Sequence, residues 1–142
     1  MNKPDDFRID LCVKHSSVNP STISESLSIQ PEFAWGVGDL VGSQVRTSTF
    51  WRGTLVEGSG AIEFERALES VLSVLSDRLG FLNQTMASGG ELSLTIRTLA
   101  EVQDGKVAEV QLNAPFLEAL ALRRIDLAFE VWMKAAEVEI SQ

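Results

Sequence analysis

Hydrophobic and polar residues alternate along residues 7–15, near the N-terminus. A period of two with one polar side is typical of a strand in a sheet that is covered on one face only. Residues 125–132 repeat the pattern near the other end of the chain. The alternating apolar positions are Phe7, Ile9, Leu11 and Val13 in the first segment and Ile125, Leu127, Phe129 and Val131 in the second.

A capped short helix is predicted between the first strand and Pro31, in the segment NPSTISESLSIQP. Asn19 is a favourable N-cap, because its side chain can accept a hydrogen bond from a free amide of the first turn. Pro20 suits the first helical position, and Ile23 and Leu27 share one face. Pro31 prevents any continuation of the helix.

The middle of the chain predicts a glycine-rich loop, a strand and a long helix. Residues 32–42 have the glycine density of an irregular loop, and residues 45–56 are rich in strand-forming Thr, Phe, Trp and Val. Residues 61–79 have apolar side chains at three- and four-residue spacing, which predicts an amphipathic helix. Gly80 is expected to end this helix, and residues 81–87 are expected to form a further short helical turn.

The last third predicts a strand at residues 91–101, a hairpin turn at Asp104-Gly105 and a partner strand at residues 107–112. Asn113 and Pro115 then repeat the cap-and-proline device before a further helix. The expected fold class is α+β, in the order β-α-β-α-β-β-α-β, with a mainly antiparallel sheet and helices on one face. This order is that of a ferredoxin-like variant with extra strand material. We expect one domain over residues 1–142, with a core at about residues 7–133 and short flexible ends.

Composition and charge narrow the classes of function. The chain has 142 residues, is 44% hydrophobic and 23% charged, and has a formal net charge of −8. An acidic surface repels phosphate backbones, so no nucleic-acid partner is expected. The apolar runs are too short to span a bilayer, and the N-terminus has no signal-peptide pattern. One cysteine and no metal-ligand spacing favour a cytoplasmic location with no metal or other cofactor.

Few residues offer nucleophilic or acid–base chemistry. The chain has one histidine, one cysteine and no tyrosine. Cys12 and His15 are three residues apart in a predicted strand, so their side chains point to opposite faces and cannot act as a pair. We expect Cys12 to be an inert small residue and His15 to be a solvated loop residue, with a general-base role for His15 as the alternative. No catalytic residue is assigned.

Carboxylates and tryptophans are the remaining candidates for a binding surface. Asp126 and Glu130 share the polar side of the last strand, and Asp10 lies on the polar side of the first, so the three could converge if these strands are neighbours. A solvated polar sheet face is the simpler interpretation. Trp35, Trp51 and Trp132 are speculative contact residues, because aromatic side chains in loops or on polar sheet faces often mark interfaces.

Short motifs along the chain resemble a bacterial family of domains of unknown function, number 4279. They are Leu27-x-Ile29-x-Pro31, Trp35, Gly38-Asp39, Trp51, Leu117-x-x-Leu120-x-Leu122 and Ile125-Asp126-Leu127. The resemblance covers residues 7–132 and implies a small bacterial cytoplasmic protein without an assigned activity or catalytic residue. Family members usually have glycine at the position of Ser28. Trp51 and Gly38-Asp39 would be structural or binding positions by this likeness.

The expected function is that of a non-enzymatic interaction domain that uses the open sheet face to bind a protein partner or a second copy as a homodimer. One specific form is an immunity-type protein that neutralises a basic toxin by charge complementarity. The alternative is a small-ligand-binding protein or a carboxylate-based enzyme that uses the same face.

Overall fold

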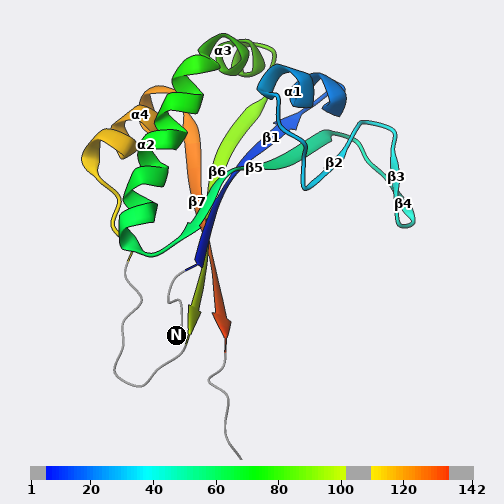
Figure 1. The fold of residues 1–142 in the computed structure, drawn as a ribbon. Coiled ribbons are helices and arrows are strands. Elements are labelled where there is room, and N and C mark those ends of the chain that lie inside the picture. The colour runs from blue at the N-terminus through cyan, green and yellow to red at the C-terminus, as the bar shows by residue number, and fades with distance from the viewer. Residues whose placement is uncertain (1–5, 102–109, 135–142) are drawn as a thin grey trace, which may run out of the picture.

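The computed structural model describes residues 6–101 and 110–134, and its main feature is a five-stranded sheet (Figure 1). The strand order is β2-β5-β1-β6-β7. All neighbouring strands are antiparallel except β6 and β7, which are parallel. The strands of this sheet are β1 (Asp6–His15), β2 (Phe33–Trp35), β5 (Thr49–Ser59), β6 (Glu91–Glu101) and β7 (Ile125–Lys134).

Four helices pack against one face of this sheet and leave its other face open (Figure 1). They are α1 (Pro20–Leu27), α2 (Ala61–Asp77), α3 (Leu79–Ala87) and α4 (Ala114–Leu122). A separate two-stranded hairpin of β3 (Leu40–Val41) and β4 (Gln44–Val45) projects beyond the β2 edge. The described residues therefore form an α+β fold with an open, mostly antiparallel sheet, as the alternating pattern predicts.

The core lies between the sheet and the helices. The apolar side of β1 is fully buried at Ile9 and Val13, and the helix stripes at Ile23 and Val71 meet it. Trp51 on β5 is also fully buried, and its ring lies over Gly53, where a Cβ atom would come within 2.5 Å of the indole. Glycine at this position is therefore required by the close approach of the tryptophan ring.

Both predicted helix caps are confirmed. The Asn19 side chain accepts a hydrogen bond from the backbone N–H of Ser21 at the start of α1, and the Asn113 side chain accepts from the N–H of Phe116 at the start of α4. The helix α1 ends at Leu27, and the C-cap residue that follows, Ser28, has a left-handed backbone with φ of 56°. Glycine adopts this conformation without the steric strain that a Cβ atom introduces.

Four predictions about element boundaries need correction. The loop at residues 32–42 contains β2 and β3, because this segment docks on β5 and folds back as a hairpin. The strand expected at residues 45–56 begins later, at Thr49, because Val45 belongs to that hairpin. Gly80 lies inside α3, and the break between helices falls at Arg78.

The fourth correction concerns the strand expected at residues 107–112. Residues 110–112 have no regular structure, and the remainder of that strand lies outside the described residues. The hairpin turn at Asp104-Gly105 and the two ends of the chain also lie outside them. The sheet gains its last strand through α4 instead, because β6 and β7 are parallel and a parallel pair needs such a crossover.

Candidate binding surface on the open sheet face

The open face is lined by the polar positions of the alternating strands. Arg8 and Asp10 come from β1, Arg52 from β5, Arg97 from β6 and Glu130 from β7. The register places Arg97 between Arg8 on one side and Glu130 on the other. A bulge between β1 and β5 falls beside Asp10 and leaves Thr54 directly opposite it. Strand pairing therefore brings together residues that are up to about 120 positions apart in the sequence.

Asp10 is the centre of an ion-pair network. One carboxylate oxygen accepts a hydrogen bond from Arg52 Nε at 2.8 Å, and the other accepts from Thr54 Oγ1 at 2.9 Å. Arg8 and Arg97 each place a guanidinium nitrogen 3.6 Å from the same carboxylate. The Asp10 side chain has 0% exposure. A carboxylate this deeply buried is stable only when it is paired and hydrogen-bonded.

Two outer carboxylates complete the network. Glu130 accepts hydrogen bonds from Arg52 Nη1 and Arg97 Nε, each at 3.3 Å. Glu32 contacts Arg8 Nη2 at 3.1 Å and Arg97 Nη1 at 3.7 Å. The three arginines and the three carboxylates have equal and opposite formal charge, so the network is neutral as a whole.

The charge state of Arg52 is set by its burial and by its two carboxylate partners. Burial alone would lower the pKa of the Arg52 guanidinium, but its hydrogen bonds to Asp10 and Glu130 raise that pKa above the ordinary arginine value. The guanidinium therefore stays charged. Its Nη2 atom is buried without a hydrogen-bond partner among the described residues.

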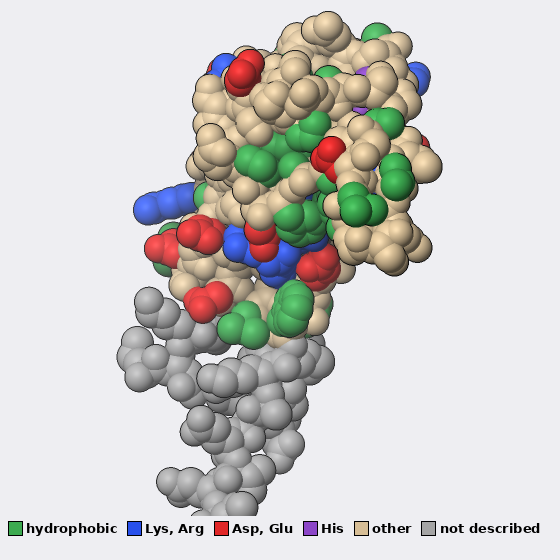
Figure 2. All heavy atoms as spheres, turned by 90° about the vertical axis from the view of Figure 1, so that its right-hand side faces the viewer, with side chains coloured by type: hydrophobic (Ala, Val, Ile, Leu, Met, Phe, Trp, Pro, Cys, Tyr) green, Lys and Arg blue, Asp and Glu red, His purple; other side chains and the backbone are tan. Residues whose placement is uncertain are grey.

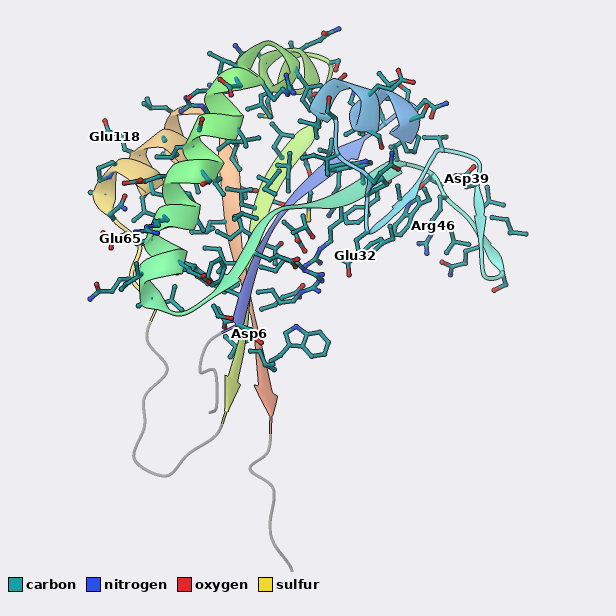
Figure 3. The ribbon with its side chains drawn as sticks, viewed as in Figure 1. Asp6, Glu32, Asp39, Arg46, Glu65 and Glu118 are labelled. Carbon is teal, nitrogen blue, oxygen red and sulfur yellow. The ribbon has the colours of Figure 1, made fainter. Side chains whose placement is uncertain are left out.

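A stacked aromatic group lies next to the network, at the β2 edge. Trp35 and Phe50 are stacked with ring centroids 4.9 Å apart, and Phe33 stacks on Phe50 at 5.5 Å. The Arg46 guanidinium lies 4.4 Å from the centre of the Trp35 ring, which is a cation–π contact. In Figure 3, the labelled Glu32 lies beside the open face, between the sheet centre and the projecting segment that carries Asp39 and Arg46.

Figure 2 shows this face from the side opposite to α2 and α4, with arginine and carboxylate side chains in the middle and hydrophobic side chains around them. Phe33 is 41% exposed at the β2 edge. Leu99 and Trp132, which are neighbours across β6 and β7, are exposed at the other end. The face therefore combines a closed, charged centre with exposed apolar borders.

The structure joins two of the three predicted carboxylates. Asp10 and Glu130 share Arg52 and Arg97 as common partners. Asp126 lies on the same face of β7 but is exposed, and it has no ion pair with another described residue. Because β6 lies between β1 and β7, the two strands are not neighbours, and the convergence that was expected only for neighbouring strands does not extend to Asp126.

The three tryptophans occupy different environments. Trp35 belongs to the aromatic group of the open face, although it lies on β2 and not in a loop. Trp132 is 58% exposed on the same face. Trp51 points to the opposite side, where it is fully buried and its Nε1 donates to Ser24 Oγ at 3.0 Å. The expectation that Trp51 contacts a partner is corrected, because the core and α1 cover it.

His15 also differs from the expectation of a solvated loop residue. It is buried at the end of β1, and its Nδ1 accepts hydrogen bonds from the backbone N–H groups of Ser17 and Val18. The ring proton is therefore on Nε2, which donates to Ser88 Oγ at 2.9 Å. Both ring nitrogens hold the structure together, and neither is free to act as a general base.

Cys12 lies on the open face, buried beside Thr95 with its Sγ 3.8 Å from Thr95 Oγ1. Burial raises the pKa of the Cys12 thiol, so it is mainly protonated near neutral pH and a poor nucleophile. As predicted, Cys12 and His15 point to opposite faces of β1.

No group of three metal-ligating side chains occurs among residues 6–101 and 110–134.

The sequence pattern does not single out the arginines of this surface, nor Glu32 and Phe33 beside them. Arg8 and Arg97 occupy polar positions of predicted strands, and Arg52 lies within the strand predicted at residues 45–56. An arginine at a polar strand position looks like a solvated side chain when the neighbouring strands are unknown. Arg8 and Arg97 lie opposite each other on neighbouring strands, and like charges in this position repel. The buried Asp10 carboxylate, which contacts both, offsets the repulsion.

The fold and this surface define a small α+β domain whose helices cover one face of a sheet and leave a charged and aromatic face open. The chain belongs to the family of domains of unknown function DUF4279, whose family model matches residues 6–134. The resemblance inferred from the sequence motifs is thereby confirmed. No curated protein and no solved structure matches the chain. Within the described ranges, no helix has the length and hydrophobicity needed to cross a membrane.

Proposed function

We propose that this protein is a non-enzymatic interaction domain and that its open sheet face contacts a protein partner. The observation that carries the proposal is the make-up of that face, where a neutral arginine–carboxylate layer lies between exposed Phe33 and Trp132. Aromatic residues and arginine are enriched where protein surfaces meet, and they contribute most of the binding energy there. The buried centre gives such a surface a fixed shape before binding.

The charge of the chain supports a basic partner. The formal net charge is −8, while the ion-pair network is neutral. Exposed carboxylates at Glu57, Glu91 and Asp126 lie on the open face around that network. Exposed charges at the rim of an interface accelerate association with a partner of opposite charge. A specific form of the proposal is a bacterial cytoplasmic immunity-type protein that neutralises a basic toxin.

The aromatic group favours a second candidate, the binding of a small planar ligand. Phe33 offers a partly exposed ring in a group of three mutually stacked rings, and such rings bind planar molecules by stacking. A carboxylate-based enzyme has less support, because the Asp10 side chain is covered by arginines and cannot touch a substrate. A thermal-shift screen with planar ligands, compared between wild type and Phe33→Ala, distinguishes this candidate from protein binding.

The main test is affinity capture with purified protein as bait at low salt. The matched variants are Phe33→Ala on the open face and Ile62→Ala on α2, because both remove an exposed large apolar side chain. We expect the wild type and Ile62→Ala to retain the same basic partner, and Phe33→Ala to weaken its affinity at least about tenfold. Retention should also fall between about 50 and about 300 mM salt. Equal retention by all three proteins, or no retained basic protein, would overturn the proposal.

A further inference from the structure

We propose that the outer edge of β7 is a homodimerisation surface, on which two copies of the chain pair their β7 strands antiparallel into one continuous sheet. Within residues 6–101 and 110–134, β7 pairs only with β6 and so forms an edge of the sheet. The strand is ten residues long. An unpaired edge of this length presents a row of backbone N–H and C=O groups that can bind another strand.

The second half of β7 is poorly covered on both faces. Ile125 is buried beneath the helices, but Phe129 and Val131 on the same side of the strand are 50% and 58% exposed. Trp132 is exposed on the opposite side. Figure 1 shows β6 and β7 continuing past the lower end of α2 and α4. These exposed apolar side chains at an unpaired edge are available for cross-strand contacts with a strand that pairs there.

Local charge permits two copies to approach despite the acidity of the chain. Glu130 lies in the middle of the exposed half of β7, and its carboxylate is held by Arg52 and Arg97 of the same copy. The side chains next to it along the strand, Phe129 and Val131, are uncharged. Like-charge repulsion between acidic residues elsewhere is screened over about 8–10 Å at physiological salt.

One register makes β7 complementary to itself. A two-fold axis at Glu130 sets Phe129 opposite Val131 of the second copy, which gives an apolar pair on the helix side. On the open side it sets Ala128, a small exposed residue, opposite Trp132. At the two ends it sets exposed Asp126 opposite the backbone position of residue 134. Each pair occurs twice, as an isologous interface requires.

This self-complementarity is the reason to infer a second copy and not an unrelated strand. All the favourable pairs are made between residues of β7 itself. The two Glu130 carboxylates that meet at the axis each accept hydrogen bonds from Arg52 and Arg97 of their own copy, which reduces the repulsion between them. The open sheet faces of both copies remain uncovered and point to the same side, so the inference does not depend on the proposed function.

The test is the molar mass in solution by size-exclusion chromatography with light scattering. We expect the wild type to be a dimer at tens of micromolar, and Val131→Asp to be a folded monomer, because the new charge is placed in the apolar pair. Ile62→Asp is the matched control, since it also places a carboxylate at an exposed apolar position and should remain dimeric. A monomeric wild type at about 100 μM, or an unchanged dimer in Val131→Asp, would overturn the inference.

Discussion

Asp10 faces the open side of the sheet, yet its side chain is inaccessible to solvent because the arginines of three strands lie over it. Three guanidinium groups and the Thr54 hydroxyl surround a single carboxylate. Removing its charge would leave these cations close together with too little negative charge between them. At the scale of single residues, Asp10 therefore determines whether the open face keeps its shape.

We predict that Asp10→Asn lowers the free energy of unfolding by about 3–5 kcal/mol, the usual cost of breaking a buried ion pair from one side. Urea denaturation measures this change. Glu32→Gln is the control, because that carboxylate is about one-third exposed and its ion pairs should contribute about 0–1 kcal/mol. Equal effects of the two substitutions would show that Asp10 is not the centre of the network.

Ser28 provides a second prediction, because it holds a left-handed backbone conformation at the end of α1. Ser28→Gly should raise the free energy of unfolding by about 0.5–1 kcal/mol, since the strain of a Cβ atom there exceeds the extra entropy that glycine loses on folding. Ser26→Gly, inside the same helix, should lower it by about 0.5–1 kcal/mol. Thermal unfolding of both variants gives the comparison. A destabilised Ser28→Gly protein would contradict the account of this helix end.

Cys12 gives a prediction about pH. Burial raises the pKa of its thiol, so between the unfolded and folded pKa values the unfolded chain loses this proton first. The contribution of Cys12 to stability is therefore present below about pH 8.5 and is lost as the pH rises above it. Cys12→Ala should remove this part of the alkaline loss in denaturation experiments.

The same burial should make the thiol slow to react. Ellman's reagent at about pH 8 should label the native protein much more slowly than the chain in urea, because the thiolate is the reactive form. Labelling of the native protein at the rate of the unfolded chain would contradict the buried position of Cys12.

At the scale of elements, the sequence correctly predicts the helix caps and the alternating strands, but it does not predict where the strands begin and end. Asn19 and Asn113 predict helix starts because the capping interaction is made within one turn of the chain. The start of β5 is different, because the alternating pattern continues back to Val45. Only the pairing of Val45 with Leu40 in the β3–β4 hairpin assigns Val45 to another strand. Strand ends thus depend on partners that the sequence does not display.

The caps carry a prediction at this scale. Asn19→Ala and Asn113→Ala should each lower the free energy of unfolding by about 1 kcal/mol, because each leaves an amide of the first turn without its acceptor. Asn83→Ala in the middle of α3 is the matched control and should be neutral or slightly stabilising, since alanine is the better helix former. Chemical denaturation of the three variants checks this. A similar loss for all three would mean that the capping hydrogen bonds contribute little.

At the scale of the whole molecule, the sequence predicts that one sheet face stays open, but not what occupies it. Alternation alone places Asp10 and Glu130 on that face. Arg52 becomes their common partner only through the strand order β5-β1-β6-β7, and that order depends on long-range pairing. The prediction for Trp51 is wrong for a related reason. Its side of β5 is covered by α1, and no local pattern reveals that contact.

The proposed protein partner contacts the open sheet face and not the helix-covered side. Hydroxyl-radical footprinting of the captured complex, read by mass spectrometry, tests it most directly. We expect the partner to protect Phe33 and Trp35 from oxidation while Ile62 and Leu122 on the helices remain as reactive as in the free protein. Protection of Ile62 and Leu122 with unchanged reactivity of Phe33 and Trp35 would contradict it.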